Sequence, residues 1–274
     1  MKDNALTLII LEKLDNNTLV LPTLPDIALR VREAAEDPEV DIAGLADIIT
    51  TDPALASRII TFSNSAMLRG TKAVTDVKEA CMRMGLSKVK TISTALALEQ
   101  LFVTDSEVIK VQMHKAWMDS VTITSNAVAA FSVCRKIARL DIDTLFLTAL
   151  VHRIGMIAVI NEAGNSPDKY GSEAYLKNTA NRVCPILGGQ ILKKWGFDQD
   201  IIHAVENWST LKNDTPSVTY TDYLRLSGAL IGIFGRNQAK VIKLCQGKKM
   251  FEDIEVFDGD DFLEVQNAVL ASFL

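Results

Sequence analysis

The sequence is poor in histidine, in aromatic residues and in paired cysteines. Only three of its 274 residues are histidine, and 6% are aromatic. Because metal sites in proteins combine several imidazole, carboxylate or thiolate ligands, three histidines leave room for few such sites. The cysteines lie far apart and form no C-x-x-C pair; they are Cys81, Cys134, Cys184 and Cys245. This scatter indicates reduced, buried thiols in a cytosolic protein rather than a disulfide framework.

Long apolar runs and a signal peptide are also missing. The nearest approach to a membrane span is LSGALIGIFG at residues 226–235, which is well short of the roughly 20 residues that a bilayer requires. The N-terminal stretch MKDNALTLIILEKLDNN has acidic residues on both sides of a short apolar run and no small-residue cleavage site. We therefore expect a soluble, cytoplasmic protein without a membrane partner.

The composition is that of a globular protein with a net negative charge. Hydrophobic residues make up 48% of the chain and charged residues 23%, and the formal charge is -5 at pH 7. A chain of this length can bury a substantial core without disulfides or structural metals. The negative charge argues against a protein built mainly to hold nucleic acid, although it leaves room for a local basic patch.

Sequence motifs for nucleophilic catalysis and phosphate binding are absent. There is no G-x-S-x-G elbow, and no cysteine has a histidine within one helical turn in the sequence. The only tight glycine pair in a helical context, LGGQ at residues 187–190, matches neither G-x-G-x-x-G nor the P-loop. We interpret this pair as a site of close helix packing.

Apolar periodicity predicts an all-α protein. Apolar residues recur at three- and four-residue spacing along most of the chain, as in residues 26–36, where Ile27, Val31 and Ala34 form one stripe. No segment shows the convincing alternation that is typical of strands. The composition of residues 103–111 suggests a boundary, so we expect two lobes, residues 1–105 and residues 106–274.

Several helix ends can be placed from single residues. Asp41, Asp52 and Asp76 each precede an apolar helical run and are expected N-caps, the second of them followed by proline at the favoured first position. Gly85 suits a left-handed position after a helix, and we expect Ser87 to cap the next one. Beyond residue 106 we predict a helix over about 112–139 and a second, uninterrupted helix over 141–160.

The pair His152-Arg153 stands inside the apolar run TALVHRIGMIAVI. The spacing places His152 on one face with Leu145, Ala149 and Met156, so its side chain points into a core or a pocket wall. The simplest interpretation is a buried histidine satisfied by a backbone carbonyl. Arg153 cannot bind a metal and stays protonated.

A basic stretch over residues 69–90 carries six cations against two carboxylates. Two helices separated by a glycine could form a helix-turn-helix that binds nucleic acid. The alternative is the solvated basic face of a helical bundle, which the acidity of the chain and the lack of interleaved aromatic residues favour.

The sequence resembles the HDOD family, the HD-related output domains of bacterial signal-transduction and regulatory proteins. The resemblance is carried by LPTLPDIALRVREAAEDPEVDIAGLADIITTDPALASRIITFSNSA, by VTDVKEACMRMGLSKVKTISTALALEQLF, and by WMDSVTITSNAVA, FLTALVHRIGMIAVI and CPILGGQILKKWGF. It covers roughly residues 5–235. It implies a two-lobed helical bundle whose C-terminal lobe is similar to the HD domain.

The resemblance also implies where a metal would be held in the related HD phosphohydrolases. At those positions this chain has Asp119 in place of a histidine, His152-Arg153 in place of His-Asp, Cys184 where histidine is common, Asn207-Trp208 at a histidine-rich helix end, and Gly228 near the last aspartate. Too few ligands survive, so we expect no bound metal, no cofactor and no catalytic residue. We hypothesise that Arg153 pairs with Asp119 as a buried substitute for the metal bridge.

The function that the sequence favours is that of a non-catalytic regulatory protein that binds an unidentified protein partner. The candidate partner-binding residues are Asn64, Ser65, Arg83, Lys88 and Lys90. Two alternatives remain: a metal-dependent phosphohydrolase acting on a nucleotide or cyclic dinucleotide, and a nucleic-acid-binding regulator. The sequence leaves the oligomeric state open.

Overall fold

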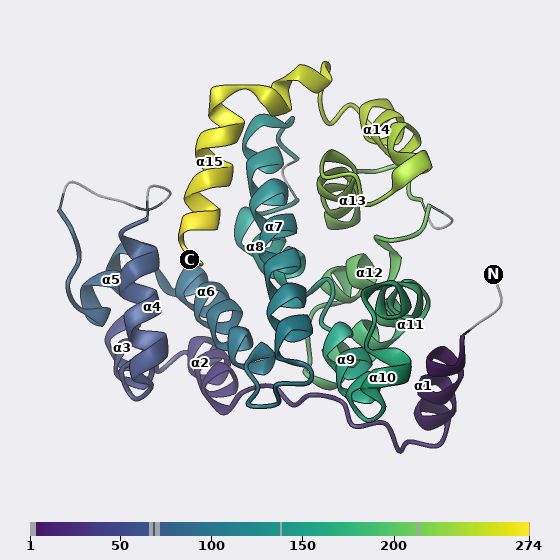
Figure 1. The fold of residues 1–274 in the computed structure, drawn as a ribbon. Helices are drawn as coiled ribbons and strands as arrows, with labels where there is room; N and C mark the ends of the chain where they lie inside the picture. The colour runs from purple at the N-terminus through teal and green to yellow at the C-terminus, as the bar shows by residue number, and fades with distance from the viewer. Residues whose placement is uncertain (1–3, 66–67, 69–71, 138, 212–213, 274) are drawn as a thin grey trace.

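The computed structural model describes residues 4–65, 68, 72–137, 139–211 and 214–273. Every regular element in these ranges is a helix, which confirms the all-α prediction. Two groups of helices lie on either side of a long central helix, α7 (Figure 1). The first group, called the first lobe, contains α2 (Asp26–Glu36), α3 (Ile42–Thr50), α4 (Pro53–Ser63), α5 (Val77–Met84), α6 (Leu86–Leu98) and the 3-10 turn η1 (Glu99–Phe102).

The second lobe is built around α7 (Lys110–Val133), which packs against α8, α9, α13 and α15. Its helices are α8 (Ile142–Val151), α9 (Met156–Gly164), α10 (Pro167–Tyr170), α11 (Glu173–Lys194), α12 (Gln199–Asn207), α13 (Tyr220–Leu230), η2 (Gly235–Asn237), α14 (Gln238–Gly247), η3 (Ile254–Asp258) and α15 (Asp260–Ala271). The predicted close helix packing at LGGQ is confirmed, because a Cβ on Gly188 would lie 2.7 Å from Val205 of α12.

Most helix ends follow the expected caps. The carboxylates of Asp41, Asp52 and Asp76 accept hydrogen bonds from backbone N–H groups of the first turns of α3, α4 and α5. Gly85 has a φ of 77°, as expected after α5. The prediction that Ser87 caps the next helix is wrong: α6 begins at Leu86, directly after Gly85.

The stretch predicted as one helix over 141–160 is two helices. A turn over residues 152–155 separates α8 from α9. A Cβ on Gly155 would lie 2.5 Å from the carbonyl oxygen of Cys184, so only glycine lets this turn approach α11 so closely. The helix predicted over about 112–139 likewise ends earlier, at Val133, and residues 134–137 after it are not helical.

One segment, Ile142–Gly164, is apolar and long enough to pass as a membrane span by length and composition. The prediction that residues 226–235 come nearest to a span is therefore wrong. However, 72% of its most apolar window is buried inside the protein, and the turn at residues 152–155 divides it. The segment is thus a pair of core helices.

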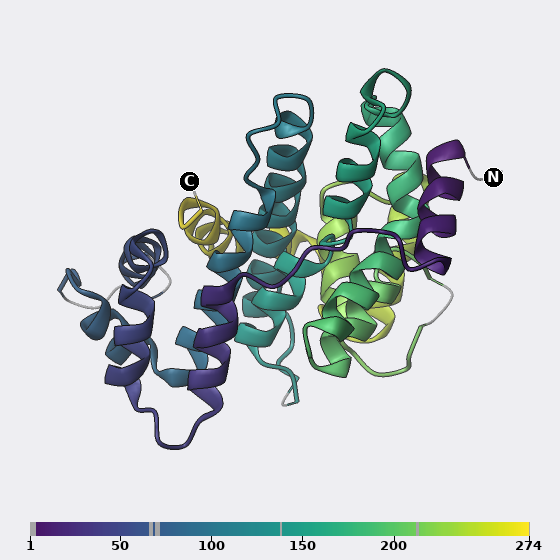
Figure 2. The ribbon, with the colours of Figure 1, turned by 90° about the horizontal axis from the view of Figure 1, so that it is seen from below.

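Helix α1 (Ala5–Asp15) does not lie with the first lobe, although the sequence predicts that residues 1–105 form one lobe. Its side chains Leu6 and Ile10 are buried against α9 and α11 of the second lobe. Lys13 also pairs with Glu162 of α9 at 2.7 Å. Residues 16–25 then cross the underside of the molecule to α2 (Figure 2). The N-terminal segment therefore connects the two lobes, with α1 packed on the second lobe and residues 16–25 leading to the first.

Candidate functional site

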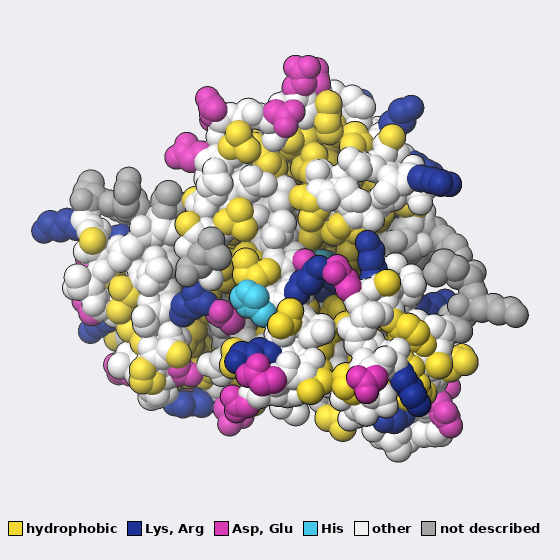
Figure 3. Space-filling view, in the orientation of Figure 1, with side chains coloured by type: hydrophobic (Ala, Val, Ile, Leu, Met, Phe, Trp, Pro, Cys, Tyr) yellow, Lys and Arg dark blue, Asp and Glu magenta, His cyan; other side chains and the backbone are white. Residues whose placement is uncertain are grey.

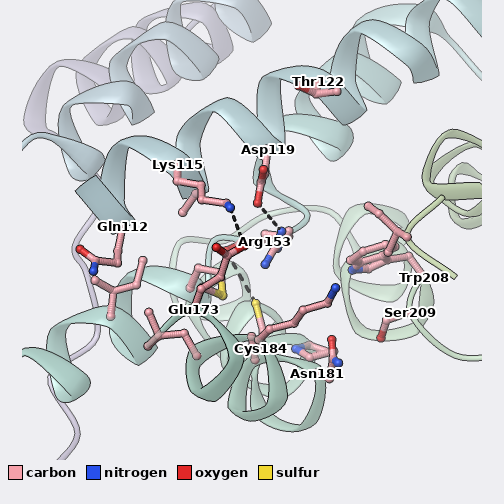
Figure 4. Close-up of a pocket in the computed structure, with 18 of the residues that line it drawn as sticks. Gln112, Lys115, Asp119, Thr122, Arg153, Glu173, Asn181, Cys184, Trp208 and Ser209 are labelled. Atoms are coloured by element: carbon pink, nitrogen blue, oxygen red, sulfur yellow. Dashed lines mark hydrogen bonds and ion pairs between the residues drawn. The ribbon is translucent and has the colours of Figure 1, made fainter. Parts of the chain in front are cut away.

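A pocket of about 710 Å³ lies in the second lobe, between α7, α9, α11, the end of α12 and residues 231–234 (Figure 4). It includes or adjoins the positions at which the resemblance places a degenerate metal site. Asp119, Arg153 and Cys184 line it directly, whereas His152 and Gly228 lie behind its wall.

Two helices give the pocket most of its polar side chains, at helical spacing. Gln112, Lys115 and Asp119 come from one face of α7, and Lys177 and Asn181 come from one face of α11. Residues three or four apart in a helix share a face, so this spacing was available in the sequence. Sequence reasoning missed these lysines because it considered only the inherited ligand positions.

Asp119 and Arg153 form an ion pair, as hypothesised, with Arg153 Nη1 2.9 Å from Asp119 Oδ2. The pair joins α7 to the turn between α8 and α9. It is not buried, however: 20% of the Arg153 side chain and 41% of the Asp119 side chain are exposed. Exposure of this size means that solvent screens the pair, so we expect it to position Arg153 more than to stabilise the fold.

His152 has the environment that the simplest interpretation predicts. Its side chain is fully buried, and its Nδ1 lies 2.6 Å from the carbonyl oxygen of Ala149. The ring packs edge-to-face on Trp208, with 4.8 Å between centroids. Burial, with a smaller contribution from the Arg153 charge, lowers the pKa of His152 to about 3. The imidazole is therefore neutral, and its Nε2 has no hydrogen-bond partner among the described residues.

Cys184 lies in the pocket wall as a protonated thiol. Its Sγ is 3.7 Å from the carbonyl oxygen of Arg153. Burial raises the pKa of this thiol to about 11, although the Arg153 charge opposes the shift. A thiol in this state is a poor nucleophile and a poor metal ligand.

The Gly228 position supplies no ligand and instead makes room for aromatic rings. A Cβ on Gly228 would lie 2.9 Å from Phe234 and 3.6 Å from Trp208. At the other helix-end position, the Asn207 side chain donates to the carbonyl oxygen of His203 at 2.8 Å. Both positions therefore serve packing and chain geometry.

The residues at this site do not fit a divalent metal. The described residues contain no group of three or more His, Cys, Asp or Glu side chains placed to hold one. The one carboxylate of the inherited set, on Asp119, is paired with a guanidinium that carries a permanent positive charge. Arg153 would therefore repel a cation at the place where the related enzymes hold theirs.

The predicted partner-binding residues lie in the first lobe, away from the pocket. The Asn64 amide accepts from the backbone nitrogen of Val74 and donates to its carbonyl oxygen, both at 2.8 Å. Ser65 Oγ is buried without a hydrogen-bond partner among the described residues. Asn64, directly after α4, therefore fixes the position of Val74 shortly before α5.

The three cations of this set are each engaged with the protein itself. Arg83 donates to the carbonyl oxygen of Lys72 at 2.6 Å. Lys88 pairs with Asp143 at 3.2 Å, and Lys90 pairs with Glu36 at 2.6 Å. Arg69, the first cation of the basic stretch, lies outside the described residues. A nucleic acid would have to compete with these internal contacts for the same charges.

A buried ion network behind the pocket was not anticipated from the sequence. Arg225 of α13 is only 1% exposed and donates to Asp214 at 3.1 Å and to the carbonyl oxygens of Asn207 and Thr210 at 3.2 and 2.6 Å. Lys248 lies 2.7 Å from the buried Asp222. The network fixes the chain that follows α12, and with it Trp208 and Ser209 of the pocket.

The helical fold places the protein in the HD-like class, and the comparisons specify the family. The model of the HDOD domain matches residues 21–210. The chain therefore belongs to the HDOD family. The match is narrower than the predicted 5–235, but it covers both lobes. A search of curated proteins finds no match to this chain.

Solved structures give the same fold. A protein of Shewanella amazonensis SB2B, named a candidate metal-dependent phosphohydrolase, is 29% identical with a TM-score of 0.91, over 98% of each chain. An HDOD domain protein of Geobacter sulfurreducens is 17% identical with a TM-score of 0.68, over 98% of each chain. A candidate signal-transduction protein of Marinobacter aquaeolei VT8 is 18% identical with a TM-score of 0.62, over 93% of this chain and 59% of that one.

Proposed function

We propose that this HDOD protein is a non-catalytic regulator that acts in the cytoplasm by binding a protein partner. The observation that carries the proposal is the Arg153–Asp119 pair, which puts a permanent cation at the doublet position. A hydrolase of the HD type needs that position to hold a metal that activates water. The neutral, buried His152 and the protonated Cys184 offer no substitute chemistry.

A second candidate is a metal-dependent phosphohydrolase. It is favoured by the name of the Shewanella amazonensis protein, which shares 29% identity over nearly the whole chain. Fold similarity alone does not carry an activity to a new chain, so the residues of the site must decide. Those residues favour the regulator.

Metal content and hydrolysis separate the two functions. The protein would be produced with added manganese and iron, purified without chelator, and analysed by mass spectrometry for bound transition metal. Hydrolysis of bis(p-nitrophenyl) phosphate with added Mn²⁺ would be followed in parallel. We expect no stoichiometric metal and no turnover above that of the His152→Ala variant. One equivalent of metal that the variant loses, together with turnover, would establish the phosphohydrolase.

The partner would be sought by cross-linking in cells, with mass spectrometry of the linked peptides. The wild type would be compared with the triple variant Arg83→Met, Lys88→Met, Lys90→Met and with a control, Lys193→Met, on the other lobe. We expect one partner whose cross-links are lost in the triple variant and retained in the control. Circular dichroism must show that the triple variant is folded, because its cations hold internal contacts. Equal capture by all three proteins would remove these residues from the interface.

A further inference from the structure

The pocket has a volume within the range of small-molecule sites, and its lining has two kinds of surface. One part is charged, with Lys115, Asp119, Arg153 and Glu173 gathered on one side in Figure 4. Trp208 lies on the other side, and Phe234, Ile231 and Ile233 also line the pocket. In Figure 3, acidic and basic side chains lie next to hydrophobic ones near the middle of the face that is shown.

We infer that this pocket binds a small organic anion, a phosphate monoester or carboxylate on an apolar body, with Arg153 and Lys177 as its counter-charges. The anion would occupy the place from which Arg153 excludes a metal. Such a ligand could serve as the input signal of the proposed regulator. That last role rests on the proposed function, whereas the binding itself does not.

The charge balance of the lining favours an anion. Three cations, Lys115, Arg153 and Lys177, face two carboxylates, Asp119 and Glu173. Lys115 pairs with Glu173 at 2.6 Å, so its charge is neutralised locally. Lys177 makes no ion pair with any residue that the structure describes.

Arg153 keeps hydrogen-bonding capacity for a ligand. A guanidinium has five N–H donors, and within the described chain Asp119 accepts from one of its nitrogens, Nη1. A planar guanidinium suits a phosphate or carboxylate because it can donate two parallel hydrogen bonds. Asp119 fixes the position of this side chain and accepts from only one of its nitrogens among the described contacts. This fixed position lowers the entropy cost of binding a ligand.

The apolar wall would cover the body of the ligand. Ile231 and Ile233 are each 41% exposed although they line the pocket, so a ligand could remove their surface from water. Trp208 is fixed from behind by the His152 ring, and the chain that follows it is fixed by Arg225. The wall is therefore formed before any ligand arrives.

Titration calorimetry with four probes tests whether the pocket recognises both the anionic group and the apolar body of a ligand. The probes are 1-naphthyl phosphate, 1-naphthoate, uncharged 1-naphthol and inorganic phosphate. We expect at least one naphthyl anion to bind about tenfold more tightly than 1-naphthol and inorganic phosphate. The two anions distinguish a phosphate ester from a carboxylate. Equal affinity for 1-naphthol and both anions would overturn the inference.

Matched variants locate the site. Lys177→Met should weaken the preferred anion about threefold to tenfold, and Arg153→Met by about tenfold or more. Lys194→Met, on the same helix but outside the pocket, should leave the affinity unchanged. Lys177 is exposed, so its variant keeps the test valid even if Arg153→Met fails to fold. Binding that survives in both pocket variants would also overturn the inference, whatever the metal and partner experiments show.

Discussion

His152 is the residue through which acid should act on the folded protein. The unfolded chain binds a proton on this imidazole near pH 6.5, whereas burial beside Arg153 lowers its pKa in the folded state to about 3. Between these values the unfolded state holds the extra proton. The contribution of neutral His152 to the free energy of unfolding is therefore fully present above pH 6.5. It falls as the pH decreases toward 3, by about 1.4 kcal/mol per pH unit where the folded and unfolded states differ by one whole proton.

The variant His152→Asn tests this prediction. Asparagine can still donate to the carbonyl oxygen of Ala149, but it does not titrate. Urea unfolding would be measured at about pH 5.5 and about pH 4.5. Between them we expect the wild type to lose about 1.4 kcal/mol more than the variant. Parallel losses in the two proteins would show that His152 is protonated in the folded state.

Loss of the Arg225 side chain, which lies behind the pocket wall, should lower the free energy of unfolding strongly. Its guanidinium is buried and donates to one carboxylate and two carbonyl oxygens. Arg225→Met would leave buried acceptors unpaired, although Lys248 would still neutralise part of the charge. We expect a loss of about 3 kcal/mol in the free energy of unfolding, measured in urea. Arg236→Met, at an exposed position in η2, should change it by less than about 0.5 kcal/mol.

At the scale of elements, what could be predicted followed from local chemistry. An aspartate before an apolar run satisfies free backbone N–H groups whatever the rest of the chain does, so Asp41, Asp52 and Asp76 placed three helices correctly. The division of α8 from α9 depends on α11, which packs against Gly155 from far along the chain. No property of the segment itself reveals such a contact. The same holds for Arg225, whose carboxylate and carbonyl partners lie at the end of α12 and in the irregular segment between α12 and α13.

Helix α15 shows another long-range dependence, and it gives a prediction. The ring of Phe273, just beyond its end, lies 5.7 Å from Trp117 of α7 and 5.8 Å from Phe146 of α8. Phe146 in turn contacts Phe62 of the first lobe. Phe273→Ala should lower the free energy of unfolding by about 3 kcal/mol, because it opens a cavity between these rings. Leu263→Ala, at an exposed position on α15, is the control and should cost under about 1 kcal/mol.

At the scale of the whole molecule, the two lobes are joined by more than the chain between them. The largest hydrophobic cluster runs from Ile27 of α2 to Phe273 without interruption. Arg32 of the first lobe donates to the carbonyl oxygens of Trp195 and Gly196 at 2.9 and 3.0 Å and lies 4.6 Å over the Phe197 ring. A cation at the end of α11 also interacts favourably with the helix dipole. The hydrophobic core is therefore continuous across the boundary that the sequence predicts at residue 105.

This continuous core predicts a single cooperative unfolding transition. All three tryptophans, Trp117, Trp195 and Trp208, lie in the second lobe, whereas the helices that give the far-ultraviolet circular dichroism lie in both. Urea transitions followed by tryptophan fluorescence and by circular dichroism should therefore coincide in midpoint and slope. Separate midpoints would show that the first lobe unfolds by itself. Arg32→Met removes one link between the lobes, so it should lower the midpoint of both signals together if the lobes unfold as one unit.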